Sequence, residues 1–288
     1  MKPALLLVLT ALVSAAQQGA DSGWRLATED TELAIGIMDG QPALKTLKVR
    51  GSQRNWLSKP VREPLMPEVV LDGSPVKTGW KFQGGALDAA GEQLTLRFEN
   101  GNPRLALESI WRARPGHGPA EHWLTIANQA GRTVTITHQD SLVLDALTLA
   151  AGEKAQVWWI NRGGSNATRQ GGTFVVDADA EFDQTLVSDP MDGSSPVPWM
   201  AVQVGKARGL YVGWEFSGIG RVRGRTAAPS ILDLRVGNPP DFKTDLAPDE
   251  VFLVPAAFVG CYNGDIDDGA YTLHRFVLEK LLPPLPKM

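Results

Sequence analysis

The feature that most constrains the fold is a succession of short apolar runs separated by glycine-rich turns. Segments such as TELAIGIMDG (31–40), GEQLTLRFENG (91–101) and KARGLYVGWEFSG (206–218) alternate apolar with polar residues or run apolar, and many end in Gly, Asn-Gly or Asp-Gly. Alternation of period two is typical of half-buried strands, and these dipeptides favour tight hairpin turns. The pattern predicts an antiparallel β-protein.

The number of such runs is too large for a small sandwich. The chain has 288 residues, 43% of them hydrophobic, with 30 Gly and 20 Pro spread between the runs. The composition does not change abruptly anywhere between residues 20 and 265, and no repeat of fixed period is present. We therefore expect one all-β domain over residues 17–268, a large antiparallel β-supersandwich of two extended sheets.

The N-terminus has the pattern of an export signal. Lys2 precedes an apolar run from Ala4 to Val13, and the small residues Ser14, Ala15 and Ala16 follow. A membrane-spanning helix needs about 20 apolar residues, so this run is short for one. Residues 1–16 are predicted to be a cleaved signal peptide and the mature chain to be periplasmic or extracellular; an uncleaved anchor is the alternative.

Charge and cysteine content exclude several classes of function. The formal net charge is -4, with both signs scattered along the chain, so we expect neither nucleic acid nor a membrane as a partner. Cys261 is the sole cysteine, which rules out an internal disulfide and a cysteine metal site. We expect it to be a buried apolar residue, and we expect no metal and no cofactor.

One convincing helix lies at the C-terminal end, in DDGAYTLHRFVLEKLLPPLPKM (267–288). Asp267 or Asp268 is expected to cap it, and Tyr271, Leu273, Phe276, Val277 and Leu281 are spaced to form an apolar face. The prolines that follow predict a stiff connector. Residues 269–288 are thus assigned to a helix and a proline-rich linker, with a simple C-terminal tail as the alternative.

The second half of the chain resembles a known domain. Trp214 to Gly218, Val236-Gly237, Phe242 to Pro255 and His274 to Phe276 match, in order, the motifs that end the N-terminal β-supersandwich of family 36 glycoside hydrolases, the α-galactosidase group. The resemblance covers about residues 24 to 285. Sugar mutarotases share a broadly similar sandwich, so the resemblance implies a galactose mutarotase-like fold.

In that family a catalytic (β/α)8 barrel follows the sandwich. Retaining hydrolysis of an α-galactoside needs two carboxyl groups about 5 to 5.5 Å apart, which the family supplies as barrel aspartates. This chain has no Lys-Trp-Asp signature and no alternation of strands and helices after residue 282, so the resemblance assigns it no catalytic residue. It implies a linker into a missing catalytic barrel, an α-galactoside as substrate of the whole enzyme, and possible self-association as an open alternative.

The residues also suggest two other kinds of site. The acidic stretch GDIDDG at Asp265, Asp267 and Asp268 lacks the Glu that a calcium loop needs at its twelfth position, where Phe276 stands, so a turn with a helix cap is favoured. A mutarotase-like acid–base site would use histidine. No motif links His117, His122, His138 or His274 to a particular Glu, so we interpret each as structural or solvent-exposed.

The strongest candidate for ligand contact is VWWINRGGSNATRQGGTF (157–174). Adjacent residues of a strand face opposite ways, so one of Trp158 and Trp159 is expected in the core and the other outside, where an indole suits a sugar face. Asn161 and Arg162 add hydrogen-bond donors. Asp189, in the turn-rich loop 187–199, is a further candidate for sugar hydroxyls; two sandwich tryptophans beside a surface loop, and loop capping by Asp189, are the alternatives. Asn166 starts an Asn-Ala-Thr glycosylation signal.

Two hypotheses follow. The first is the non-catalytic N-terminal domain of an exported α-galactosidase-like hydrolase. The second is a self-contained secreted carbohydrate-binding sandwich.

Overall fold

The computed structural model describes residues 23–162, 171–189, 191–193, 195–215 and 218–283. The predicted signal peptide (1–16) and the glycosylation signal at Asn166 lie outside these residues. Within them, no helix is long and apolar enough to cross a membrane.

The described residues form four antiparallel sheets. The largest has nine strands in the order β14-β13-β16-β17-β21-β10-β9-β8-β7. Its strands are β7 (Lys81–Leu87), β8 (Gln93–Asn100), β9 (Leu105–Arg112), β10 (Ala120–Asn128), β13 (Ala155–Asn161), β14 (Gly172–Asp177), β16 (Pro196–Val204), β17 (Arg208–Trp214) and β21 (Val251–Asn263).

Three four-stranded sheets accompany the large sheet. The first has β1 (Trp24–Ala27), β2 (Thr31–Met38), β3 (Gln41–Val49) and β4 (Val61–Arg62). The second has β20 (Thr244–Leu246), β11 (Val134–Ile136), β5 (Glu68–Leu71) and β6 (Ser74–Lys77). The third has β12 (Asp140–Thr148), β19 (Ile231–Gly237), β18 (Gly220–Ala228) and β15 (Asp183–Ser188).

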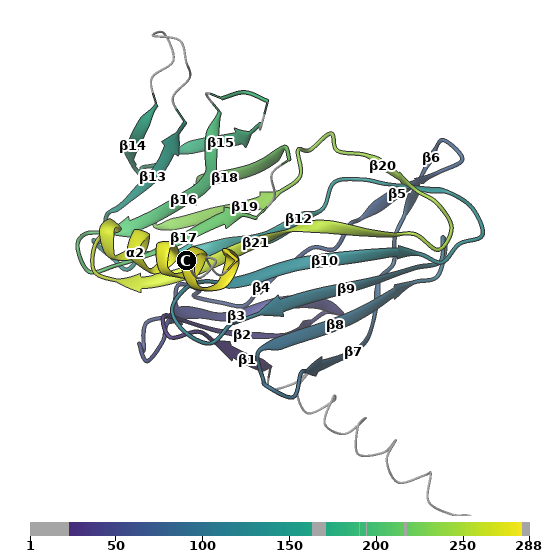
Figure 1. Cartoon of the computed structure of the whole chain (residues 1–288), viewed down its shortest axis with the longest axis horizontal. Helices are drawn as coiled ribbons and strands as arrows, with labels where there is room; N and C mark the ends of the chain where they lie inside the picture. Colours follow the sequence, from purple (N-terminus) through teal and green to yellow (C-terminus); the bar gives the residue numbers. More distant parts are fainter. Residues whose placement is uncertain (1–22, 163–170, 190, 194, 216–217, 284–288) are drawn as a thin grey trace, which may run out of the picture.

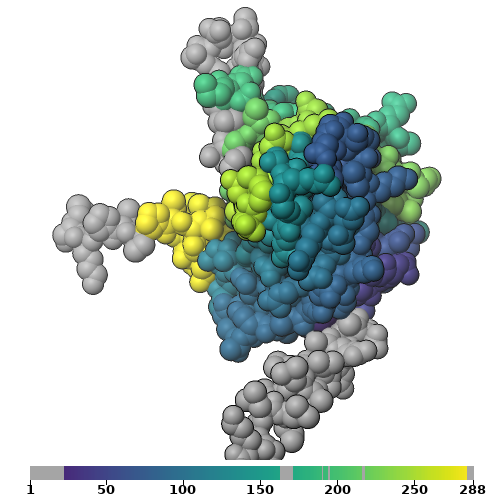
Figure 2. Space-filling view, turned by 90° about the vertical axis from the view of Figure 1, so that its right-hand side faces the viewer, coloured from purple at the N-terminus to yellow at the C-terminus, as the bar shows by residue number. Residues whose placement is uncertain are grey.

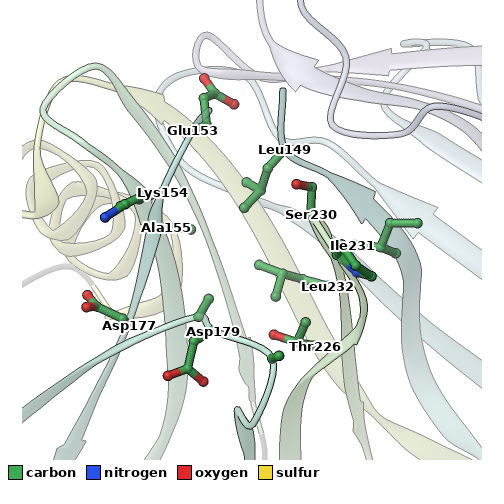
Figure 3. Close-up of a pocket in the computed structure, with 13 residues that line it drawn as sticks. Leu149, Glu153, Lys154, Ala155, Asp177, Asp179, Thr226, Ser230, Ile231 and Leu232 are labelled. Atoms are coloured by element: carbon green, nitrogen blue, oxygen red, sulfur yellow. The ribbon is translucent and has the colours of Figure 1, made fainter. Parts of the chain in front are cut away.

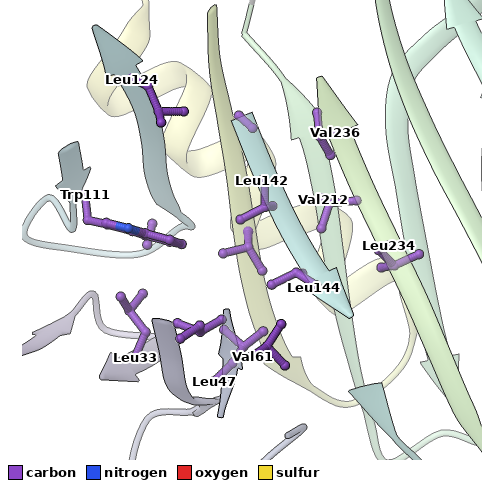
Figure 4. Packing of buried hydrophobic residues seen from close by; sticks show 14 of the residues in the cluster. Leu33, Leu47, Val61, Trp111, Leu124, Leu142, Leu144, Val212, Leu234 and Val236 are labelled. Carbon is purple, nitrogen blue, oxygen red and sulfur yellow. The ribbon is translucent and has the colours of Figure 1, made fainter. Parts of the chain in front are cut away.

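The core lies between the large sheet and the smaller ones (Figure 1). One contiguous apolar cluster draws residues from all four sheets. Figure 4 shows Leu33 and Leu47 of the first small sheet, Trp111 of β9, and Leu144 and Leu234 of the third converging on this space. Alternate residues of the strands supply the cluster, as the period-two pattern predicts. The prediction of an all-β supersandwich with a short C-terminal helix is confirmed. The predicted number of sheets was wrong: the described strands form four sheets rather than two.

The helix α2 (Ile266–Phe276) packs on the other face of the large sheet, against β21 and β17, and η1 (Val277–Leu281) continues it. We call this face, turned away from the small sheets, the outer face. In Figure 2 the yellow C-terminal segment stands out from the side of the sandwich.

The cap of α2 differs from the prediction. Asp265, not Asp267 or Asp268, is the N-cap: its side chain accepts a hydrogen bond from the Asp267 backbone N–H (3.1 Å). The Asp268 carboxylate accepts one from the Asp265 N–H (3.0 Å). This reciprocal pair is a capping box, in which the third helical residue serves the cap rather than being the cap. The acidic stretch therefore has the cap-and-turn role that was favoured over a calcium loop.

Candidate binding site on the outer face of the large sheet

The two tryptophans of β13 face opposite ways, as their adjacency predicts. Trp159 is buried in the core and stacks on Phe174, with 5.5 Å between ring centroids. Trp158 lies on the outer face, half-buried, and packs against an aromatic cluster there. Its indole Nε1 is buried and has no hydrogen-bond partner among the described residues. Trp158 is thus the one of the two that a ligand on the outer face could meet.

Asn161 is the last residue of β13, and Arg162 follows it. The Arg162 guanidinium donates to the Ser195 Oγ (2.7 Å), the Ser188 Oγ (3.2 Å) and the Asp189 carbonyl (3.4 Å). The Asp189 carboxylate accepts from the Met191 N–H (2.8 Å). Arg162 and Asp189 therefore come together, but these contacts hold the loop. Asn161 Oδ1 is buried without a partner in the described residues; sugar contact by this group remains a prediction.

An aromatic cluster separates α2 from the sheet. It consists of Trp199, Ala201, Tyr211, Phe258 and Tyr262, and Leu273 of the helix packs on it. Strand neighbours make room for the rings: a Cβ at Gly260 would overlap the ring of Tyr211. Beneath the helix a largely apolar cavity of about 380 Å³ remains, with Trp199, Leu273 and Phe276 among its walls.

A charged cluster follows on the same face, along β9 and β10. Glu121 is fully buried, and its carboxylate accepts paired hydrogen bonds from Arg112 (2.9 and 2.6 Å) and from Arg114 (2.7 and 3.1 Å). Burial alone would raise the pKa of Glu121, but the two guanidinium groups hold it below its ordinary value. Arg112 also lies over the ring of Trp123, 4.9 Å from its centroid. The Glu121 carboxylate and the Arg112 guanidinium are thus both fixed in place.

A large cavity lies where β17 ends, beside this cluster. Its volume is about 840 Å³. We call it the Glu215 cavity; it is lined by Glu215, Ile219, Asn238, Pro239, Asp241, Phe242, Lys243, Phe252, Leu253, Pro255 and Ala256.

Two polar groups of this cavity are buried without a partner in the described residues, Oε1 of Glu215 and Nδ2 of Asn238. Burial, and then the nearby Glu121 carboxylate, raise the pKa of Glu215 to about 7. Ligand-binding and catalytic sites commonly contain a carboxyl group with a shifted pKa in a cavity with other polar groups.

A third cavity opens where β13 begins and β14 ends, against strands β18 and β19 (Figure 3). It has a volume of about 380 Å³, and Figure 3 shows Leu149 and Leu232 between the carboxylates of Glu153 and Asp179. Glu153 is held by Arg54 (2.6 Å) and Arg208 (3.0 Å). The cavity has no aromatic wall, and Thr226 Oγ1 is its one buried polar atom without a partner in the described ranges.

The core contains a sealed polar cluster. His122 stacks on Trp111 (4.1 Å between centroids), hydrogen-bonds the Ser109 Oγ (2.9 Å) and the Ser141 carbonyl, and lies 3.9 Å from Glu63. Burial lowers the pKa of His122 to about 3 and raises that of Glu63 to about 8. The adjoining cavity measures about 10 Å³, too small for a substrate. His122 is therefore structural.

The remaining histidines do not gather into one site. His117 contacts Glu29 (2.9 Å) and Asp30 (3.0 Å), and His138 contacts Asp140 (3.1 Å). His274 lines the cavity beneath α2. Among the described residues, no group of three or more His, Cys, Asp or Glu is arranged to hold a metal ion. Cys261 is buried, as predicted, which raises its pKa.

Sequence reasoning did not find Glu215 or Asn238 as site residues. Both belong to segments that carried the family resemblance, GWEFSG and VGNPP, but nothing local marks them as cavity-lining. They meet because Glu215 follows β17, which pairs with β21, and Asn238 begins the segment that leads from β19 to β20 beside this pair. That pairing is set by tertiary packing rather than by local pattern.

Comparison with known proteins gives matches in structure alone. No protein-family model matches the sequence, and no curated protein matches it. An α-galactosidase from Lactobacillus brevis superposes with a TM-score of 0.68 at 15% identity, over 90% of this chain and 42% of that one. The galactosidase domain of the α-galactosidase-sucrose kinase AgaSK gives a TM-score of 0.70 at 12% identity, over 88% and 42%.

A family 36 α-galactosidase gives a similar match. A doubly substituted form of AgaA from Geobacillus stearothermophilus, in complex with stachyose, has a TM-score of 0.73 at 13% identity, over 91% of this chain and 44% of that one. The chain thus spans less than half the length of these enzymes. The resemblance expected from residues 214–276 is confirmed in the structure: this chain has the fold of one part of the family 36 α-galactosidases.

Proposed function

We propose that this chain is the non-catalytic β-domain of an exported glycoside hydrolase of the α-galactosidase type. The supporting observation is that the fold matches 91% of this chain but 44% of a family 36 α-galactosidase. The reaction, hydrolysis of terminal α-galactosides, belongs to a catalytic (β/α)8 barrel that this domain supports. No catalytic residue is assigned to this chain.

The C-terminal segment offers a surface for such a barrel. Apolar side chains of α2, η1 and the next residue are exposed: Tyr271 (62%), Leu278 (52%), Leu281 (41%) and Leu282 (52%). Exposed apolar groups gathered on one element are typical of an interface. Since Leu273 and Phe276 hold the helix to the sheet, a barrel packed on its exposed residues would be fixed rigidly to the sandwich. Residues 269–288 would then be the linker between the two domains.

Export is part of the proposal and rests on the pattern of residues 2–16. A chain expressed with its own N-terminus in a secreting bacterium is expected outside the cytoplasm, with Ala16 or Gln17 as its first residue. N-terminal sequencing of the fractionated protein checks this. A cytoplasmic chain that begins at Met1 contradicts it.

The test of the catalytic assignment is a direct assay. Purified residues 17–288 are expected to release no 4-nitrophenol from 4-nitrophenyl α-galactoside above the buffer rate. Turnover that follows the folded protein through size exclusion, and that is lost on unfolding, would contradict a non-catalytic role.

A second function is favoured by the position of Trp158. Its ring lies on the outer face, and Asn161 and Arg162 follow it where β13 ends. An outward-facing indole suits a self-contained carbohydrate-binding sandwich. This alternative predicts that methyl α-galactoside changes tryptophan fluorescence in wild type but less in Trp158→Phe. Unchanged fluorescence on titration counts against it.

A further inference from the structure

The Glu215 cavity has the size of a small-molecule site. Its volume of about 840 Å³ falls in the range of roughly 300–1,000 Å³ that is usual for ligand pockets. Three separate parts of the chain form it: Glu215 after β17, the segment Asn238–Lys243 between β19 and β20, and Phe252–Ala256 in β21. Only the part from β21 belongs to a strand; the other two parts are connecting segments.

Two polar groups in its wall have no partner in the described residues. Oε1 of Glu215 and Nδ2 of Asn238 are both buried, and Asn238 is only 3% exposed. A buried polar group without a hydrogen bond costs about 1–3 kcal/mol, so folded proteins seldom leave one unless a ligand or water completes it. A carboxyl oxygen that accepts and an amide N–H that donates together suit hydroxyl groups, which do both.

The remaining walls are mostly apolar and include two aromatic rings. Phe242 and Phe252 lie 5.5 Å apart at an interplanar angle of 32°. Ile219 (50% exposed) and Leu253 (55% exposed) also line the opening, together with two prolines. A pyranose ring has one face of C–H groups, which pack on the electron-rich faces of aromatic rings, and a rim of hydroxyls. An apolar wall beside a polar pair is complementary to such a ring.

The charges of the cavity disfavour an anion. Glu215 and Asp241 bring carboxyl groups, and Lys243 is the one cation in the lining. Glu121, which lies close enough to affect Glu215, is already neutralised by Arg112 and Arg114. A neutral ligand meets no repulsion from these groups.

We propose that the Glu215 cavity binds a neutral saccharide, with a ring face against Phe242 and Phe252 and hydroxyls hydrogen-bonded to Glu215 and Asn238. This site lies apart from the predicted Trp158 platform, and it does not depend on a catalytic barrel. Its role is to hold a sugar on the sandwich.

Isothermal titration of residues 17–288 with methyl α-galactoside, methyl α-glucoside and methyl α-mannoside tests the site. At least one of the three is expected to bind saturably below about 10 mM, in the weak range typical of a single sugar ring. Glu215→Gln and Phe242→Ala are each expected to weaken that binding about tenfold, as loss of one buried contact does. Glu99→Gln, which changes an exposed carboxyl on β8 outside the cavity, serves as the matched control and is expected to bind as wild type does.

A measurement without substitution covers the case in which a variant fails to fold. Hydrogen exchange with the bound sugar is expected to slow at residues 238–243 and 252–256, and not at residues 157–162. Absence of saturable binding by all three glycosides overturns the inference. So does binding that Trp158→Phe abolishes and Glu215→Gln leaves unchanged, which would place the sugar on the β13 platform. Neither result bears on the expected lack of α-galactoside turnover, so the two proposals can fail separately.

Discussion

Glu63 and His122 are neighbours in the core, and burial moves their pKa values in opposite directions. The pKa of Glu63 rises from 4.5 to about 8, so the folded protein keeps its proton where the unfolded chain has lost it. This contribution to stability is complete below pH 4.5 and is lost as the pH rises toward 8. The pKa of His122 falls from 6.5 to about 3, so its contribution is complete above pH 6.5 and lost toward pH 3.

The two effects oppose each other between pH 4.5 and 6.5, and Glu63 dominates above pH 6.5. We predict that the free energy of unfolding falls by roughly 1 to 2 kcal/mol between pH 6.5 and 8, and that Glu63→Gln removes most of this fall. Urea unfolding at several pH values measures it, with the exposed Glu99→Gln as control. An equal slope in wild type and Glu63→Gln would show that Glu63 is ionised in the folded protein.

At the scale of elements, the pairing of β9 with β10 places one carboxylate between two guanidinium groups. Glu121→Gln is predicted to cost roughly 1 to 3 kcal/mol, because it leaves Arg112 and Arg114 without their anion. About a third of each arginine side chain is exposed, which limits the loss. The exposed pair Arg97–Glu108 (3.0 Å) on the same sheet supplies the control. Glu108→Gln is expected to change the urea midpoint little, and equal losses in the two variants would contradict the assignment.

The start of α2 is a second prediction at this scale. Asp265→Ala removes the N-cap and is predicted to cost about 1 kcal/mol. Asp267→Ala leaves the capping side chain in place and is expected to cost clearly less. Hydrogen exchange of residues 266–281 reports the helix directly. Faster hydrogen exchange in Asp267→Ala than in Asp265→Ala would show that Asp267, as predicted from the sequence, is the residue that caps the helix.

Elements differ in how well the sequence predicts them. The strands follow from apolar alternation, as in β8, where Leu94, Leu96 and Phe98 alternate into the core. The helix cap was placed two or three residues late, because several aspartates in a row satisfy the same local rule and only the backbone geometry distinguishes them. The opposite faces of Trp158 and Trp159 followed from strand geometry, whereas which one is inside depends on the register of β13 with β16.

At the scale of the whole molecule, the order of strands in the large sheet lay beyond sequence reasoning. β21 pairs with β17 and β10, which lie far from each other in sequence. That pairing sets Glu121, Phe258 and Gly213 in one row across the outer face. The Glu215 cavity arises from the same long-range order. Local pattern therefore predicted the class of fold and the opposite faces of Trp158 and Trp159. It did not predict the charged cluster of Glu121 or the Glu215 cavity.

The proposed function requires this sandwich to act together with a catalytic barrel. The most direct measurement is to raise antibodies against residues 23–283, capture the native protein from its source organism and sequence its peptides by mass spectrometry. We predict peptides of a (β/α)8 glycosidase barrel, in the same polypeptide or stably bound to it, and α-galactosidase activity in the captured material. A captured protein that contains this sandwich alone, with no barrel peptides and no such activity, would contradict the account.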